Sequence, residues 1–217
     1  MCMQPSFGCY CAEIQKFDPL IKFVILIHPI EWKRRIATGR MSHLCLNNSE
    51  LIQGQDYTED QKVNELLADT RYQAMVLYPG QKSLNLTGLG EEKLGQLIGP
   101  QKTPMVFVID GTWATARKTM RLSQNLNALP RVCFTPPARS NFQVRKQPKA
   151  ECYSTIEAVH HTIELLGPAV GFELQARKHD SLLRVFSVMV NRQIAFLKDA
   201  FDNPRSTSYR RPKARVA

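Results

Sequence analysis

The chain has 217 residues, of which 43% are hydrophobic and 22% are charged, and its formal net charge is +10. This composition is typical of a globular protein, and the length suits one main domain. No apolar run approaches the roughly 18 residues that a membrane span requires, and the start "MCMQPSFGCYC" lacks the pattern of a secretory signal. We therefore expect a cytoplasmic protein without a membrane segment.

Positive charge is concentrated in the second half of the chain. Residues 1–100 contain 10 Lys and Arg against 11 Asp and Glu, whereas residues 101–217 contain 19 against 8. This asymmetry favours a polyanionic partner, most simply a nucleic acid, although basic residues that only solvate helix faces would give the same count. The stretch "NPRSTSYRRPKARVA" holds five basic residues, two prolines and no acid, which is typical of a disordered basic arm.

In chain order, buried strands alternate with helices. Apolar runs predict strands at 21–27, 74–77, 104–110 and 131–135. Helical patterns, with Gly39 and Gly167 as expected stops, predict helices at 29–39, 91–99, 112–126, 154–166 and 173–201. Ser154 and Glu157 have the spacing of a capping box at the start of the fourth of these helices. The alternation predicts an α/β fold, with a mainly parallel sheet that is covered by helices on both faces.

We divide the chain into three parts. Residues 1–20 form a small N-terminal segment that contains cysteines, residues 21–202 form the main domain, and residues 203–217 form the basic tail. The N-terminal segment carries Cys2, Cys9 and Cys11, one ligand short of the four that a structural zinc ion needs. Either a histidine such as His28 or His43 completes the set, or the segment binds no metal. We expect no metal.

Three junctions of a strand or loop with a turn can meet at one edge of such a sheet. They are Leu77-Tyr78-Pro79-Gly80, Asp110-Gly111-Thr112-Trp113, and the start of the helix at Ser154 and Thr155. In a parallel sheet the carboxyl ends of the strands share one edge, where α/β proteins place their ligands. Gly80 and Gly111 let the backbone approach a ligand, and Tyr78 and Trp113 offer flat apolar surfaces. Asp110 and Thr112 can equally be simple helix caps.

Several well-known site patterns are absent from the sequence. There is no G-x-G-x-x-G after a strand and no G-x-x-x-x-G-K-[ST], so neither a Rossmann dinucleotide site nor a P-loop is expected. H-E-x-x-H and G-x-S-x-G are also missing. His160 and His161 are neighbours on one helix and point in different directions, so we interpret them as structural residues.

The residues carry a family resemblance. The stretches "LYPG", "IDGTWATARKTM" and "RKQPKAECYSTIEAVHH" together resemble the DTW domain family, which is named for its Asp-Thr-Trp signature. The stretch "ILIHPIEWKRRIATG" also fits the His-Pro and Thr-Gly pattern of that family. In the N-terminal segment the resemblance lacks one element, because Cys2 is the second cysteine of the usual pair and the first is missing. This puts a metal site with four thiolates in doubt.

The resemblance implies a fold and a reaction. It implies a fold related to the SPOUT methyltransferases, with a knotted edge that binds S-adenosyl-L-methionine (SAM). It also implies transfer of the 3-amino-3-carboxypropyl (acp) group of SAM to N3 of a uridine in tRNA, with release of methylthioadenosine. By the same resemblance, Asp110 is the expected base.

Roles for the other residues follow from this reaction. The expected grip on SAM comes from Leu77, Tyr78, Pro79, Gly80, Gly111, Thr112, Trp113, Ser154 and Thr155. The expected RNA contacts are Arg145 and Lys146, together with Arg34, Arg35 and Arg40 after the first strand. A methyltransferase of the SPOUT type, acp transfer onto ribosomal RNA and a silent RNA-binding module are the alternatives. The oligomeric state is left open.

Overall fold

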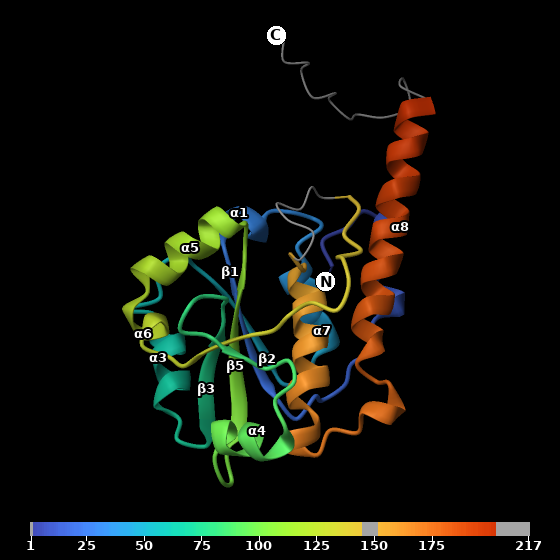
Figure 1. The fold of residues 1–217 in the computed structure, drawn as a ribbon. Coiled ribbons are helices and arrows are strands. Elements are labelled where there is room, and N and C mark those ends of the chain that lie inside the picture. The colour runs from blue at the N-terminus through green and yellow to red at the C-terminus, as the bar shows by residue number, and fades with distance from the viewer. Residues whose placement is uncertain (1, 145–151, 203–217) are drawn as a thin grey trace.

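The structure is a computed structural model that describes residues 2–144 and 152–202. Its centre is a sheet of six strands in the order β2-β1-β5-β3-β6-β4 (Figure 1). The strands are, in that order, Ser49–Gln53, Lys22–Ile27, Thr103–Asp110, Tyr72–Leu77, Arg131–Cys133 and Leu84–Asn85. Every pair of neighbouring strands is parallel, which confirms the expected α/β class.

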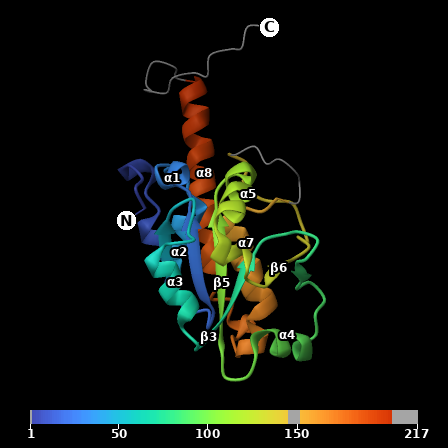
Figure 2. The ribbon, with the colours of Figure 1, turned by 90° about the vertical axis from the view of Figure 1, so that its left-hand side faces the viewer.

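Helices cover both faces of the sheet. The helices are α1 (Pro29–Trp32), α2 (Thr38–Cys45), α3 (Gln61–Ala68), α4 (Glu91–Ile98), α5 (Trp113–Leu122), α6 (Gln124–Asn127), α7 (Thr155–Leu166) and α8 (Asp180–Asp202). Side chains of α2, α7 and α8 share the larger core on one face, and those of α3, α5 and α6 share the smaller core on the other. Figure 1 shows the sheet between these two layers, and Figure 2 looks onto the side that carries α3 and α5.

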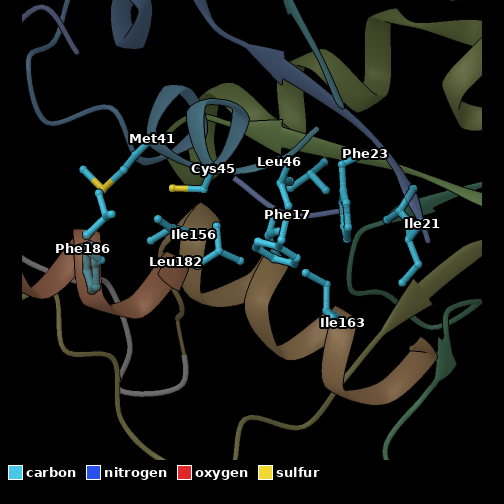
Figure 3. Packing of buried hydrophobic residues seen from close by; sticks show 14 of the residues in the cluster. Phe17, Ile21, Phe23, Met41, Cys45, Leu46, Ile156, Ile163, Leu182 and Phe186 are labelled. Carbon is cyan, nitrogen blue, oxygen red and sulfur yellow. The ribbon is translucent and has the colours of Figure 1, made fainter. Parts of the chain in front are cut away.

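The larger core lies between the sheet and α7. This cluster contains Phe23 of β1, Met41 of α2, Ile156 and Ile163 of α7, and Phe186 of α8, with Met41 and Phe186 at one end and Phe23 toward the other (Figure 3). The side chains of β1 that point to the other face, Val24 and Leu26, belong to the smaller core, so β1 is buried on both faces. Each such large apolar side chain contributes about 1.5–3 kcal/mol when it leaves water, and the continuous apolar run of β1 follows from its position inside the sheet.

The edge strand β2 carries a small ion network. Glu50 accepts hydrogen bonds from the Lys22 amino group at 3.0 Å and from the Lys62 amino group at 2.5 Å. Burial by itself would raise the pKa of Glu50, but the two lysines outweigh it and the pKa is lowered. As an edge strand, β2 has a neighbouring strand on one side only, and Glu50 can contact both lysines there. For this reason its sequence "SELIQ" lacks the apolar run of an inner strand.

Most expected elements are confirmed, and three boundaries were wrong. The helix expected at 29–39 is two helices, and Gly39 lies inside α2, whose N-cap is Ala37. The helix expected at 112–126 breaks at Ser123, whose hydroxyl accepts a hydrogen bond from the Tyr57 amide at 3.0 Å. The last helix begins at Asp180 and not at 173, because Arg177 has a left-handed backbone with φ of 48°. The capping box of α7 is present, with Gly167 at the C-cap.

The N-terminal segment, expected as an appendage, packs against α8. Its two short 3-10 helices are Ser6–Gly8 and Cys11–Glu13. Cys2 and Tyr10 are buried in the larger core, and Phe7 stacks on Phe196 with 5.5 Å between ring centroids. Arg192 of α8 also donates a hydrogen bond to the carbonyl of Cys9. No helix in the described parts of the chain is long and apolar enough to cross a membrane.

Candidate active site

Asp110 is the last residue of β5 and lies at the carboxyl edge of the sheet. Its register partner in β1 is Ile27, and its carbonyl accepts a hydrogen bond from the His28 amide at 3.0 Å. The side chain is only 4% exposed and points toward α2 and α7. The hydroxyl of Thr155, the first residue of α7, donates a hydrogen bond to Asp110 Oδ1 at 2.6 Å. The fold therefore holds this carboxylate in one orientation.

Two glycines permit the close packing around Asp110. A Cβ on Gly39 would lie 2.6 Å from both Cγ and Oδ2 of Asp110, so α2 can approach the carboxylate only with glycine at this position. A Cβ on Gly111 would lie 2.5 Å from the hydroxyl of Thr115 and 3.7 Å from Cβ of His28. Sequence reasoning proposed Gly111 and missed the contact of Gly39. The available signal was a glycine within a helix, where it costs stability unless packing requires it.

The turn after Asp110 starts α5. Thr112 is the N-cap residue, and its hydroxyl accepts a hydrogen bond from the Thr115 amide at 3.2 Å. Trp113 is the first residue of the helix and is half-buried. The helix-cap interpretation is thus correct for Thr112, whereas Asp110 belongs to the strand and faces Thr155 instead.

Ser154 and Thr155 have different roles at the start of α7. The amide and hydroxyl of Ser154 both donate to Glu157 Oε2, at 2.8 Å and 2.6 Å. Glu157 also accepts from the Ser140 hydroxyl and from the Asn141 amide, each at 2.7 Å. The Ser154 side chain is thereby used within the protein, where it ties the chain around residue 140 to the helix. Thr155 is the one of the pair that reaches the candidate base.

The segment Leu77-Tyr78-Pro79-Gly80 follows the neighbouring strand, and its side chains divide between the two faces. Leu77 packs against the larger core, whereas Tyr78 packs against the smaller one. The ring of Tyr78 lies below the guanidinium of Arg131, at 5.9 Å from the ring centroid. Pro79 and Gly80 are exposed. Tyr78 thus lies on the face of the sheet opposite to Asp110, so its ring and the carboxylate do not share one wall as we had expected.

The arginines after β1 fall into two groups. Arg34 and Arg35 are exposed in the connection between α1 and α2, and Arg34 lies 3.5 Å from Glu31. Arg40 is only 4% exposed; it donates to the carbonyls of Arg34 and Trp32, and its guanidinium lies over the Trp32 ring. The charged group of Arg40 thus holds the loop, and a contact of this residue with RNA stays a prediction. Arg145 and Lys146 lie outside the described residues.

The three N-terminal cysteines gather at one place. The sulfur atoms of Cys2, Cys9 and Cys11 all lie within 4.8 Å of one another. Burial would raise the pKa of Cys2, but hydrogen bonds from the Gln4 backbone and from Cys11 outweigh it and lower the pKa. Neither candidate for a fourth ligand points there, because His28 Nδ1 caps α1 and His43 Nδ1 faces the Ser49 hydroxyl at 2.9 Å. Within the described residues, the donor set is one short of a closed tetrahedral zinc site.

Comparison with known proteins identifies the family. A family model described as the DTW domain matches residues 1–194. The chain belongs to the DTW domain family. This match includes the signature at Asp110, Thr112 and Trp113 and the start of α7.

Curated relatives of this DTW domain protein carry one name. This chain is 28% identical over 171 residues to "tRNA-uridine aminocarboxypropyltransferase 2" of Drosophila melanogaster. The alignment covers 76% of this chain and 64% of the relative. The chain is 26% identical over 170 residues to the protein of that name from Mus musculus, covering 76% of this chain and 55% of the relative. The aligned part is thus between about half and two thirds of the length of these relatives. No solved structure gave a significant match.

Proposed function

We propose that this DTW domain protein transfers the acp group of SAM to N3 of a uridine in tRNA. The observation that carries the proposal is the pair of Asp110 and Thr155, in which a buried carboxylate at the carboxyl edge of the sheet is oriented by the first residue of α7. The names of the relatives supply the reaction and the substrate class. The basic second half of the sequence is the charge that a polyanionic substrate requires.

The chemistry assigns Asp110 the role of general base. N3 of uridine is a weak nucleophile until its proton leaves, and a carboxylate within hydrogen-bond reach contributes about 10²–10⁴ in rate. The proton passes to Asp110 while N3 forms a bond with the methylene carbon next to the sulfonium. The bond between this carbon and sulfur breaks, the electron pair returns to sulfur, and methylthioadenosine leaves. The hydrogen bond from Thr155 keeps the carboxylate aimed during this step.

We propose that SAM lies along the same edge. The exposed backbone of Pro79 and Gly80, one strand away from Asp110, offers amide and carbonyl groups to the adenosine part. Trp113 is half-buried at the start of α5 and offers a flat surface. These residues fit a neutral adenosine with a charged amino acid end, and they suit it better than a polyphosphate, because no glycine-rich phosphate loop follows a strand.

We also propose that this edge has the knotted topology of SPOUT proteins. The support is the path of the chain. Strand β6 lies two positions from β5 in the sheet, and yet α7, which follows β6 in the chain, begins beside Asp110 at the end of β5. The end of β6 at Cys133 and the start of α7 at Thr155 are therefore separated by the width of β3, which is the arrangement that a knotted edge requires.

For tRNA we propose a basic surface on the same side. Arg34 and Arg35 follow β1 at this edge and are exposed, and Arg117 and Lys118 of α5 are exposed as well. Arg40 positions the loop that presents the first pair. By sequence, Arg145, Lys146 and the basic stretch at 203–217 would extend the surface. Phosphate contacts of this kind predict binding that weakens steeply with salt.

The decisive experiment incubates the purified protein with unmodified tRNA and SAM and identifies both products by mass spectrometry. An acp-uridine together with methylthioadenosine is the expected result. Formation of S-adenosylhomocysteine and a methylated base would replace acp transfer by methyl transfer. An absence of any product with tRNA would leave the activity proposal without support.

Variants then test the role of Asp110. Asp110→Asn keeps the shape and removes the base, and we expect acp transfer to fall by about 10²–10⁴. Asp69→Asn is the matched control, since Asp69 precedes β3 at the opposite edge and only pairs with Arg71. If Asp110→Asn retained the rate of the control, the general-base role would be wrong.

A further inference from the structure

A second cluster of chemically active side chains lies away from Asp110, where α7 meets the start of α8. It consists of His160 and Glu164 of α7, with His179 and Asp180 from the following segment. His160 lies 2.9 Å from Asp180, measured from Nε2 to Oδ1. Along α7, His160 is five residues beyond Thr155, which places it roughly 7.5 Å farther along the helix axis. The proposed transfer reaction does not use this cluster.

His179 is the unusual member of the cluster. Its side chain is 0% exposed, and among the described residues neither ring nitrogen has a hydrogen-bond partner. An imidazole without partners in a buried place costs on the order of 1–3 kcal/mol. Its Nε2 faces two carboxylates, at 3.6 Å from Glu164 Oε1 and 3.8 Å from Asp180 Oδ1, which is too far for hydrogen bonds. The ring thus points at acceptors without bonding to them.

These separations match the edges of a metal coordination shell. In a tetrahedral zinc site with bonds of 2.0–2.1 Å, neighbouring ligand atoms lie about 3.3–3.4 Å apart. The distances from Asp180 Oδ1 to His160 Nε2 and to His179 Nε2, 2.9 and 3.8 Å, lie on both sides of this value. One ligand atom from each of His160, His179 and Asp180 falls within 4.8 Å of the others.

We propose that His160, His179 and Asp180 bind one divalent transition-metal ion of the zinc type. Two imidazole nitrogens and one carboxylate oxygen are ligands that zinc prefers, and a water molecule would complete the four-coordinate shell. The bound ion would hold the start of α8 on α7.

Arg177 is the group that competes with the ion. Its guanidinium donates to both oxygens of Asp180, at 2.7 Å and 2.8 Å, and to Glu164 Oε1 at 3.4 Å. Its side chain is 54% exposed, so it can turn to water when an ion takes an oxygen of Asp180. The ring of Phe172 packs against His179 and supports this ligand, and His161 holds the nearby Glu164 at 3.1 Å from Oε2.

The three cysteines are a second place where a metal could bind, so the test must separate the two. We would titrate the metal-free full chain with Co²⁺ and record its absorption spectrum. Thiolate ligands give strong charge-transfer bands in the near ultraviolet, whereas a site of nitrogen and oxygen ligands gives only the visible bands of tetrahedral cobalt. The proposal expects one equivalent of Co²⁺ with visible bands and no accompanying thiolate band, displaced by Zn²⁺.

Variants assign the signal to this cluster. His179→Gln and the more conservative Asp180→Asn should each weaken Co²⁺ binding by at least about 100-fold, the upper end of what loss of a supporting partner costs. His43→Gln, on α2 and remote from the cluster, is the control and should bind as the wild type does. Asp180 is 42% exposed, so its variant is expected to fold even where His179→Gln does not. Zn²⁺ should also raise the urea midpoint of the wild type and not that of Asp180→Asn.

Two results would overturn the proposal. One is that the wild-type protein binds Co²⁺ only with thiolate bands, or not at all. The other is that Asp180→Asn keeps the nitrogen and oxygen signal at full affinity. None of these readouts depends on acp transfer, so the metal site stands or falls separately from the proposed activity.

Discussion

A methyl group added at Gly39 should disturb Asp110 first, because the three atoms nearest to it all belong to that side chain. The Cβ of alanine would lie 2.6 Å from Cγ and Oδ2 of Asp110 and 2.8 Å from its Cβ. To reach an ordinary contact of about 3.4 Å, the carboxylate must retreat by roughly 0.8 Å, against the hydrogen bond that Thr155 gives it. A displacement near 1 Å at the reacting group costs about 10²-fold in rate. We therefore expect Gly39→Ala to lower acp transfer by that order.

The same substitution makes two opposing contributions to the free energy of unfolding. Alanine in place of glycine favours a helix by about 0.8–1 kcal/mol, whereas overpacking a buried site costs about 1–3 kcal/mol. The free energy of unfolding of Gly39→Ala should thus fall by about 0–2 kcal/mol. Gly95→Ala is the matched control, because Gly95 lies in α4 and its added Cβ meets nothing within 4 Å. It should gain about 0.5–1 kcal/mol and keep full activity.

Urea unfolding and single-turnover transfer on the two variants provide the test. If Gly39→Ala gained stability as Gly95→Ala does and retained its rate, α2 would not press on the carboxylate as described. The packing argument, and with it the view that the fold fixes one orientation of Asp110, would then be refuted.

Three further predictions follow from contacts described above. Thr155→Val removes the donor to Asp110, so transfer should fall by about 10–100-fold and the free energy of unfolding by about 1.5–3 kcal/mol, measured in the same assays. Glu157→Gln leaves one oxygen and an amide group where two oxygens accepted four hydrogen bonds, and urea unfolding should show a loss of about 2–4 kcal/mol. Glu50→Gln should cost about 0.5–1 kcal/mol at pH 7, and the cost should shrink as the pH falls below 4.5. The reason is that the lowered pKa of Glu50 contributes stability above its ordinary value of 4.5, which is lost as pH falls through the folded value. A Glu50→Gln loss that did not shrink at all as the pH was lowered to the acid limit of the folded state would exclude this origin.

The inner strands and α7 could be predicted from the sequence, because their signals are local. A continuous apolar run such as 21–27 has few interpretations in a chain of this size, and a capping box ended by a glycine marks both ends of a helix. The edge strand β2 was missed because a strand that pairs on one side needs no apolar run. Helix α2 was missed because Gly39 was read as a stop, although its reason is the contact with Asp110.

The candidate site was predicted in part. Asp110 and Thr155 come together as expected, since parallel strands bring their ends to one edge. The face on which Tyr78 would lie could not be foreseen, because a shift of one residue at the end of a strand reverses the side. The burial of Arg40 could not be predicted, because an arginine after a strand usually faces water. Here two carbonyls and the ring of Trp32 surround its guanidinium. His179 gave no signal beside His160, from which 18 residues separate it.

The contact between the N-terminal segment and α8 has a consequence for the order of folding. Arg192 bonds to the carbonyl of Cys9 across 183 residues of chain, and Phe7 and Phe196 stack nearby. On the ribosome, the first residues emerge long before α8 exists, so Cys2, Cys9 and Cys11 must wait in solvent until almost the whole described chain has been made. Closing so long a loop is among the costly steps of folding, and a chain arrested before α8 would present three uncovered thiols to the cell.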